Sequence, residues 1–221
     1  MEIRPDRQII DLTHRLDEEA TPFPGDPPVK ITAHSIRLEP GDGRQRISTS
    51  ELTTSLHCGT HMDAPFHFFA DGRTIDEVPL EACYGPALLL RLPASIHLGR
   101  IDADHLSPHG ARIKEVSRVI FNTGWHHRWG SSDYFTAHPV ITKAAAEFLV
   151  EQGVRLVGVD TPSVDQAPYE SHLALLDNGI LIIENLTNLD AITNGVFELC
   201  AFPLKVGGRD GSPVRAVALC S

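Results

Sequence analysis

The chain has 221 residues, of which 42% are hydrophobic, and its formal net charge is −10, from 29 acidic against 19 basic residues. This length and composition predict one globular domain over residues 1–221, large enough to bury a core without disulfide staples. The acidic excess argues against nucleic acid or an anionic membrane as a partner, because no surplus of cations exists to displace counterions from phosphates.

The first third of the chain is predicted to be rich in strands. A short strand begins RQIIDLTHRL (7–16), and VKITAHSIRL (29–38) alternates apolar and polar residues as a half-exposed strand does. Between them TPFPGDPP (21–28) carries four prolines, which predicts a fixed loop. PALLLRL (86–92) is a short apolar run, which indicates a buried strand.

Helices and strands alternate in the second half. A helix is predicted over 142–154, with Thr142 as its N-cap and Gly153 near its C-terminus, and a shorter helix is predicted over 170–179. Predicted strands cover 116–123, 155–160, 180–185, 197–206 and 214–219. This alternation predicts α/β layering. Because a long β-rich segment precedes it, we expect a mixed β/α domain of the swivelling β/β/α type rather than a doubly wound fold.

The sequence lacks the signals of export or membrane insertion. No run approaches 18 apolar residues, and the charged start, MEIRPDRQII, has no apolar signal-peptide core. The four cysteines form no C-x-x-C pair, so we expect them to be reduced. These features predict a cytoplasmic protein.

The segment LHCGTHMDAPFHF (56–68) collects His57, His61, Asp63 and His67. Imidazole nitrogen is the commonest protein ligand for metals, and a carboxylate can bind one metal or bridge two. In an extended segment, alternate residues point to the same side, so a loop that enters a strand would aim these side chains into one cavity, His67 included if the strand stays regular. Three ligands without thiolates are typical of an open, catalytic site. The alternative is a set of ordinary hydrogen-bonded histidines.

The string H-x-G-T-H-x-D-x-P-x-H resembles the signature of the cyclase family of metal-dependent hydrolases, which includes bacterial kynurenine formamidases and isatin hydrolases. All its defined positions are present between His57 and His67. Four further stretches resemble family motifs, so that the resemblance covers nearly the whole chain: TPFPGDPP, GVDTPSVD (158–165), IIENLTNLD (182–190) and PLKVGGRDGSPVRAV (203–217).

The resemblance implies two zinc ions that share one carboxylate. The first zinc would be held by His57, His61 and Asp63, and the second by Asp63, His172 and Glu184. Glu184 follows the apolar run ILII, where an unpaired charge would be costly, and a metal would offset that cost. Imidazole and carboxylate ligands suit manganese or iron as well as zinc. By itself His172, on a short predicted helix, is more typical of a partly exposed histidine.

The resemblance also implies a reaction. A metal-held hydroxide would attack an amide carbonyl, and His67 would accept and return the proton. We expect a hydrolase that cleaves the C–N bond of a small amide, either an N-formyl aryl amide such as N-formylkynurenine or a cyclic amide such as isatin. The alternatives are a lactone or ester hydrolase or cyclase of the same family, and a metal-dependent binding protein without turnover. The family resemblance suggests a homodimer or a higher homo-oligomer.

Two departures bear on the substrate. The formamidases tend to carry Trp just before the PGD loop, where this chain has Phe23, which can still stack on an aromatic substrate. The segment 123–135 resembles the broader cyclase group, and its aromatic residues would either line the pocket or simply pack: Trp125, Trp129, Tyr134 and Phe135. We expect His126 and His127 to lie at the surface rather than to be metal ligands.

Three other polar residues are given no catalytic role. Cys58 occupies a variable position of the motif and is expected to be a small filler. Ser163 lacks the G-x-S-x-G elbow of a serine hydrolase. Asp160 ends a predicted strand, where aspartates often cap helices or turns, and stays outside the metal set.

Overall fold

A computed structural model describes residues 7–37, 46–92 and 99–220. Its main feature is a nine-stranded sheet with the order β1-β13-β11-β5-β7-β9-β10-β4-β12. The strands of this sheet are β1 (Gln8–Asp11), β4 (His61–Asp63), β5 (Tyr84–Arg91), β7 (Arg118–Asn122), β9 (Leu156–Val159), β10 (Leu181–Glu184), β11 (Val196–Cys200), β12 (Gly211–Pro213) and β13 (Val217–Cys220).

The sheet is mixed, with a parallel centre and antiparallel flanks. Neighbouring strands β5, β7, β9 and β10 pair in parallel. The β1, β13 and β11 strands on one side and β4 and β12 on the other pair antiparallel. The central strands are short apolar runs because both of their faces are buried.

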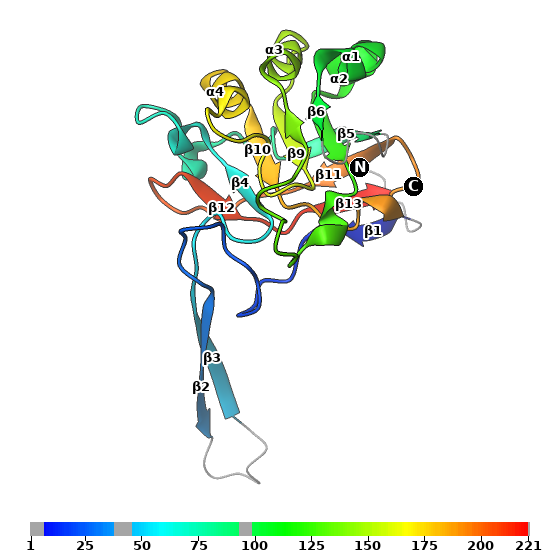
Figure 1. Cartoon of the computed structure of the whole chain (residues 1–221). Coiled ribbons are helices and arrows are strands. Elements are labelled where there is room, and N and C mark those ends of the chain that lie inside the picture. Colours follow the sequence, from blue (N-terminus) through cyan, green and yellow to red (C-terminus); the bar gives the residue numbers. More distant parts are fainter. Residues whose placement is uncertain (1–6, 38–45, 93–98, 221) are drawn as a thin grey trace.

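Helices cover one face of this sheet (Figure 1). They are α1 (Ala103–Leu106), α2 (Gly110–Val116), α3 (Lys143–Glu151) and α4 (Glu170–Asp177). As predicted, Thr142 caps α3, and its hydroxyl accepts a hydrogen bond from the amide of Ala145. Short 3-10 turns lie at η1 (Pro65–His67), η2 (Ile75–Glu77), η4 (Ser107–His109), η5 (Trp125–Arg128) and η6 (Leu189–Ala191).

Alternate residues of the central strands feed two hydrophobic cores. Val119 and Phe121 of β7 pack with the helices, whereas Ile120 joins the core on the opposite face. That second core also contains Met62 of β4 and Ala218 of β13, from strands near opposite ends of the sheet order. The sheet therefore curls around its second core, and the expected mixed β/α layering is confirmed.

Two small sheets complete the fold. Strands β2 (Lys30–Arg37) and β3 (Arg46–Thr53) form an antiparallel hairpin that projects from the body of the molecule (Figure 1). Strands β6 (Arg100–Ile101) and β8 (Val140–Ile141) pair in parallel. The apolar side chains of the hairpin are exposed, because nothing in the described chain covers them: Ile31, Ile36, Ile47 and Leu52.

Most predicted elements are confirmed, with small shifts at their ends. The strand predicted over 197–206 is partly wrong, because β11 ends at Cys200. Beyond it, Pro203 has no amide proton and makes only an isolated bridge. The strand predicted over 214–219 begins only at Val217. Strand β3 and helices α1 and α2 were not predicted from the sequence. The start of the N-terminal segment (1–6) and the last residue of 29–38 lie outside the described residues. No helix in the described ranges has the length and apolarity to cross a membrane.

Candidate metal centre

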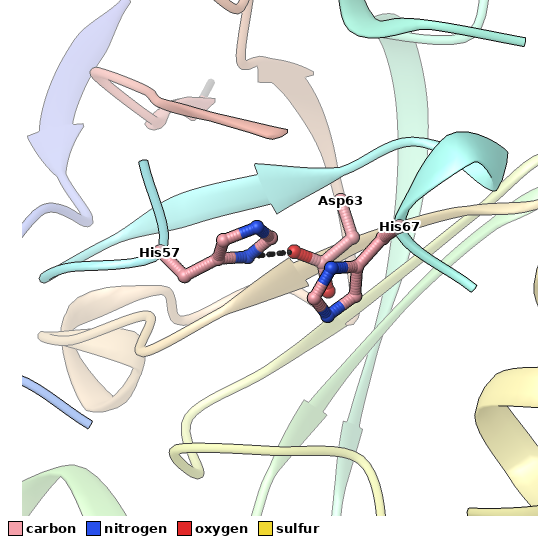
Figure 2. A group of neighbouring side chains, drawn as sticks. All are labelled: His57, Asp63 and His67. Carbon is pink, nitrogen blue, oxygen red and sulfur yellow. Dashed lines mark hydrogen bonds and ion pairs between the residues drawn. The ribbon is translucent and has the colours of Figure 1, made fainter. Parts of the chain in front are cut away.

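The histidine-rich segment enters the sheet through a glycine turn and leaves it at a proline. Gly59 adopts a φ of +69°, which favours glycine, and the chain then forms β4, His61–Asp63. The strand does not stay regular as far as His67, because Pro65 starts the 3-10 turn η1. The turn, rather than strand periodicity, brings His67 back beside the side chains of His57 and Asp63 (Figure 2).

The Asp63 carboxylate is the centre of the cluster. Its Oδ1 lies 2.8 Å from Nδ1 of His57 and 3.3 Å from Nε2 of His61. Its Oδ2 is buried and has no hydrogen-bond partner among the described residues, and Nε2 of His172 is 3.9 Å away from it. Both oxygens of the Asp63 carboxylate thus face imidazoles. We call Oδ2 orphaned because it makes no hydrogen bond within the described chain.

Glu184 and His172 complete the cluster from β10 and α4. The two oxygens of Glu184 lie 3.4 Å from Nε2 of His61 and 3.3 Å from Nε2 of His172. Glu184 is buried at the end of β10, as the apolar run predicted. His172 is also buried, so its interpretation as a partly exposed helical histidine is wrong. The structure brings the five expected metal ligands together.

Each histidine of this set is held at its second ring nitrogen. Nδ1 of His61 lies 2.8 Å from the carbonyl oxygen of Gly59, to which it can only donate. Nδ1 of His172 contacts Oδ1 of Asp165 at 2.5 Å, and Nε2 of His57 contacts Oδ2 of Asp210 at 2.6 Å. A partner on one nitrogen fixes the ring and leaves the other nitrogen for a metal, which is the usual environment of metal-binding histidines.

The electrostatics of the cluster also fit a cation. Burial raises the pKa of Asp63, but the charge on His61 and the hydrogen bond from His57 outweigh it and hold the pKa well below its usual value. Burial lowers the pKa of His172, yet hydrogen bonds to Asp165 and Glu184 raise it to about 10. Protons on the imidazoles therefore balance the buried carboxylates, a task that a divalent cation can take over.

The orphaned oxygen supports the same conclusion. A buried carboxylate oxygen without a partner is costly, because its water has been removed and nothing replaces it. Oδ2 of Asp63 has this property beside three imidazoles and a second carboxylate. The donor set of nitrogen and oxygen atoms fits a divalent metal of the zinc, manganese or iron type.

His67 differs from the other histidines because its side chain stays 31% exposed. Its ring stacks on that of His57, with centroids 4.1 Å apart, and its Nδ1 lies 3.6 Å from Oδ2 of Asp210. Burial lowers the pKa of His67, which keeps the ring neutral and able to accept a proton. Asp210 was not predicted as a site residue. An acid inside the glycine-rich turn of the closing motif, GGRDGS, was the available signal.

A cavity of about 340 Å³ opens beside the cluster, a size suited to a small molecule. Its polar wall includes His57, His67 and His172, and its apolar wall is aromatic. Residues of the aromatic wall are Phe23, Phe68 and Tyr169. The structure therefore places Phe23 at the cavity, where we expected a substrate contact.

The aromatic segment 123–135 mostly packs. Trp125 and Tyr134 are buried, and the indole N–H of Trp125 donates to the carbonyl of Tyr134 at 3.0 Å. Phe135 meets Phe23 edge to face with ring centroids 5.6 Å apart, so it supports the cavity wall from behind. The surface prediction is wrong for His126, which is buried, whereas His127 is exposed.

Two residues left out of the site have structural environments. Cys58 is buried and packs near Ala20 and Val29, in keeping with a filler role. Asp160 is fully buried and accepts hydrogen bonds from the amide and hydroxyl of Thr123.

Comparisons with known proteins identify the family of this chain. Residues 10–166 match the model of the Cyclase family, described as "Putative cyclase". Kynurenine formamidases from Bacillus cereus and Geobacillus thermodenitrificans are 33% and 36% identical to the chain, over 94% of it and 95% of each relative. Isatin hydrolase A from Labrenzia aggregata superposes with a TM-score of 0.83 at 26% identity, over 97% of this chain and 94% of that one. The chain belongs to the cyclase family.

Proposed function

We propose that this protein is a metal-dependent hydrolase of a C–N bond in a small amide. The observation that carries the proposal is the Asp63 carboxylate, which faces imidazoles with both oxygens and keeps one oxygen buried and unpartnered beside a cavity. The proposed metal ligands are His57, His61, Asp63, His172 and Glu184. We propose that these residues would hold two zinc ions, with Asp63 as a ligand of both. Manganese or iron are alternatives that the same donor atoms would accept.

A divalent cation in this donor set would supply Lewis acidity and would lower the pKa of water toward neutrality. The chain's own residues contribute the rest. Asp210 and Asp165 orient His57 and His172, and burial of Glu184 keeps the ligand set rigid. Held in this way, the ligand set would present a bound cation in a fixed position to a carbonyl oxygen that gains charge.

His67 is the proposed proton acceptor and donor. It borders the cavity, its Nδ1 faces Asp210, and it is more exposed than the histidines of the ligand set. A neutral ring there can take a proton from attacking water and return it to the leaving nitrogen. Asp210 stabilises the imidazolium form between these two steps.

The proposed substrate is an aryl amide, either N-formylated or cyclic. Phe23, Phe68 and Tyr169 give the cavity an aromatic wall opposite its polar wall. Full-length relatives at 33–36% identity are named kynurenine formamidases, and a structural neighbour is named isatin hydrolase. N-formylkynurenine and isatin are therefore the first compounds to test.

The test combines metal analysis with a substrate screen. Purified protein should contain zinc, manganese or iron by elemental analysis and should hydrolyse N-formylkynurenine or isatin, with loss of turnover in a chelator and recovery on adding back the metal. Hydrolysis of simple lactones but neither amide would favour the alternative lactone hydrolase or cyclase. Metal retained with no hydrolysis of any of them would favour a metal-dependent binding protein. Metal-free protein with full turnover would overturn the proposal.

We also propose a homodimer whose contact arm is the β2–β3 hairpin. An isolated two-stranded hairpin is marginally stable in water. This one projects from the body of the molecule (Figure 1), and its side chains of Ile31, Ile36 and Leu52 are exposed. A second copy could cover both faces. Light scattering should give twice the chain mass, and Ile36→Asp should shift it to the monomer mass. A monomer in the unmodified protein would refute the proposed role of the hairpin in dimerisation.

We also propose a cytoplasmic location, which the free cysteines suit.

A further inference from the structure

A second group of metal-binding side chains lies outside the candidate metal centre. His126 and His127 follow each other on η5, and Asp190 lies on η6. Oδ2 of Asp190 is 2.8 Å from Nε2 of His127 and 3.6 Å from Nε2 of His126. One donor atom from each of the three residues lies within 4.8 Å of the others, which is close enough for one ion.

In His126 and Asp190, the ring nitrogen or carboxylate oxygen that points away from the group contacts another residue. Nδ1 of His126 is 3.0 Å from Oδ2 of the fully buried Asp160, which Thr123 holds in turn. The other oxygen of Asp190 accepts a hydrogen bond from Nδ2 of Asn122 at 2.8 Å. His126 and Asp190 thus face each other with the outer-shell support that metal ligands usually have.

The contact between His126 and Asp190 is not a hydrogen bond. Nε2 of His126 lies 3.6 Å from Oδ2 of Asp190, beyond hydrogen-bond distance, while Nδ1 of His126 already contacts Asp160. A divalent ion between the two residues would accept a lone pair from each of the facing atoms.

We propose that His126, His127 and Asp190 form a second metal site, separate from the candidate metal centre, for a divalent ion of the zinc class. Two imidazoles and one carboxylate are a ligand set that zinc accepts, with water in the open position. The net charge of the ion and its ligands would be +1, which the neighbouring Asp160 carboxylate offsets. The ion would join the aromatic segment 123–135 to the stretch around η6.

The test counts zinc ions in the intact protein. Zn²⁺ alone is the probe, with elemental analysis after dialysis and calorimetric titration. His127→Ala is the main variant, because its side chain is 66% exposed and its loss should not disturb folding. Asp190→Asn keeps the shape and removes the charge. His109→Ala, an exposed histidine on η4, is the matched control.

The expected result is one Zn²⁺ fewer per chain in His127→Ala and in Asp190→Asn, or at least a 10-fold weaker affinity for one ion, with no change in His109→Ala. Asp63→Asn should lose ions from the candidate metal centre and keep this one, so failure at either site can be told from failure at the other. Equal zinc content and affinity in the unmodified protein, His127→Ala and Asp190→Asn would overturn the proposal and leave an ordinary imidazole–carboxylate contact.

Discussion

His61 and Glu184 are direct partners in the antiparallel ladder between β4 and β10, and Nε2 of His61 lies 3.4 Å from Oε2 of Glu184. The same register pairs Asp63 with Ile182, so that the ladder fixes His61, Asp63 and Glu184 on neighbouring backbone positions. Strand pairing is a rigid scaffold, because a one-residue slip would turn every side chain to the other face. Backbone hydrogen bonds therefore set the relative positions of three of the five proposed ligands, His61, Asp63 and Glu184.

Asp63→Asn should remove metal and activity together. The amide keeps the shape of the side chain but loses the charge that faces His57 and His61. We expect the loss of metal affinity to exceed the roughly 10- to 100-fold that loss of an outer-shell partner costs. Elemental analysis and amide hydrolysis measure both effects, with the exposed Asp104→Asn as control. Normal metal content in Asp63→Asn would exclude Asp63 as a bridging ligand.

His67→Ala should keep the metal and lose turnover. His67 lies outside the ligand set and faces the cavity, so its removal should lower kcat by about 10²- to 10⁴-fold, as expected for a lost proton carrier. Metal content and circular dichroism should match the unmodified protein. Full turnover in a metal-loaded His67→Ala variant would contradict the role.

Asp210→Asn should weaken metal binding and catalysis in part. Asp210 accepts from His57 and faces His67, and its own pKa falls to about 2, chiefly because of the hydrogen bond from His57. Replacing this carboxylate should lower metal affinity by about 10- to 100-fold, and kcat should fall even at saturating metal. A titration with Zn²⁺ followed by kinetics separates the two effects. Unchanged values for both would show that Asp210 does not position either histidine.

Phe23 should control the affinity for aryl substrates. Phe23→Ala removes an aromatic contact worth about 0.5–1.5 kcal/mol, so KM should rise roughly 2- to 13-fold with kcat nearly unchanged. Phe23→Trp offers a larger ring and should lower KM for an N-formyl aryl amide. A non-aromatic formamide serves as the control substrate and should show neither change. Equal shifts for both substrates would indicate a general packing effect.

His14 should make the protein sensitive to mild acid. Its ring stacks on Trp129, its Nε2 has no hydrogen-bond partner in the described part of the chain, and burial lowers its pKa from 6.5 to about 4. Because the folded pKa lies below the unfolded one, stability is complete above pH 6.5 and falls as the pH drops toward 4, by at most about 3 kcal/mol.

Removing the titrating ring tests this prediction. His14→Phe keeps the stacking on Trp129 and should flatten the fall in the free energy of unfolding between pH 6.5 and pH 4. Metal-free samples of both proteins should be compared by urea denaturation, so that metal loss does not contribute. The same pH dependence in both would show that His14 is not the responsible group.

The local chemistry was readable from the sequence. The cyclase motif identified His57, His61, Asp63 and His67, and the apolar run before Glu184 predicted a buried strand with a charge at its end. Strand and helix periodicity predicted most elements in the second half of the chain. Short apolar runs and a Thr N-cap are local signals, because each depends on residues only a few positions apart.

The family resemblance also assigned His172 and Glu184 to the ligand set, but only the tertiary structure decided how these distant segments meet. The β4–β10 ladder sets Glu184 beside His61, a glycine-rich turn brings Asp210 to His57, and the fold buries His126 against Asp160. None of these pairs has a sequence spacing that periodicity could reveal. The residues carry the chemistry locally, but strand register and turn geometry, which depend on the whole curled sheet, determine which of them share a site.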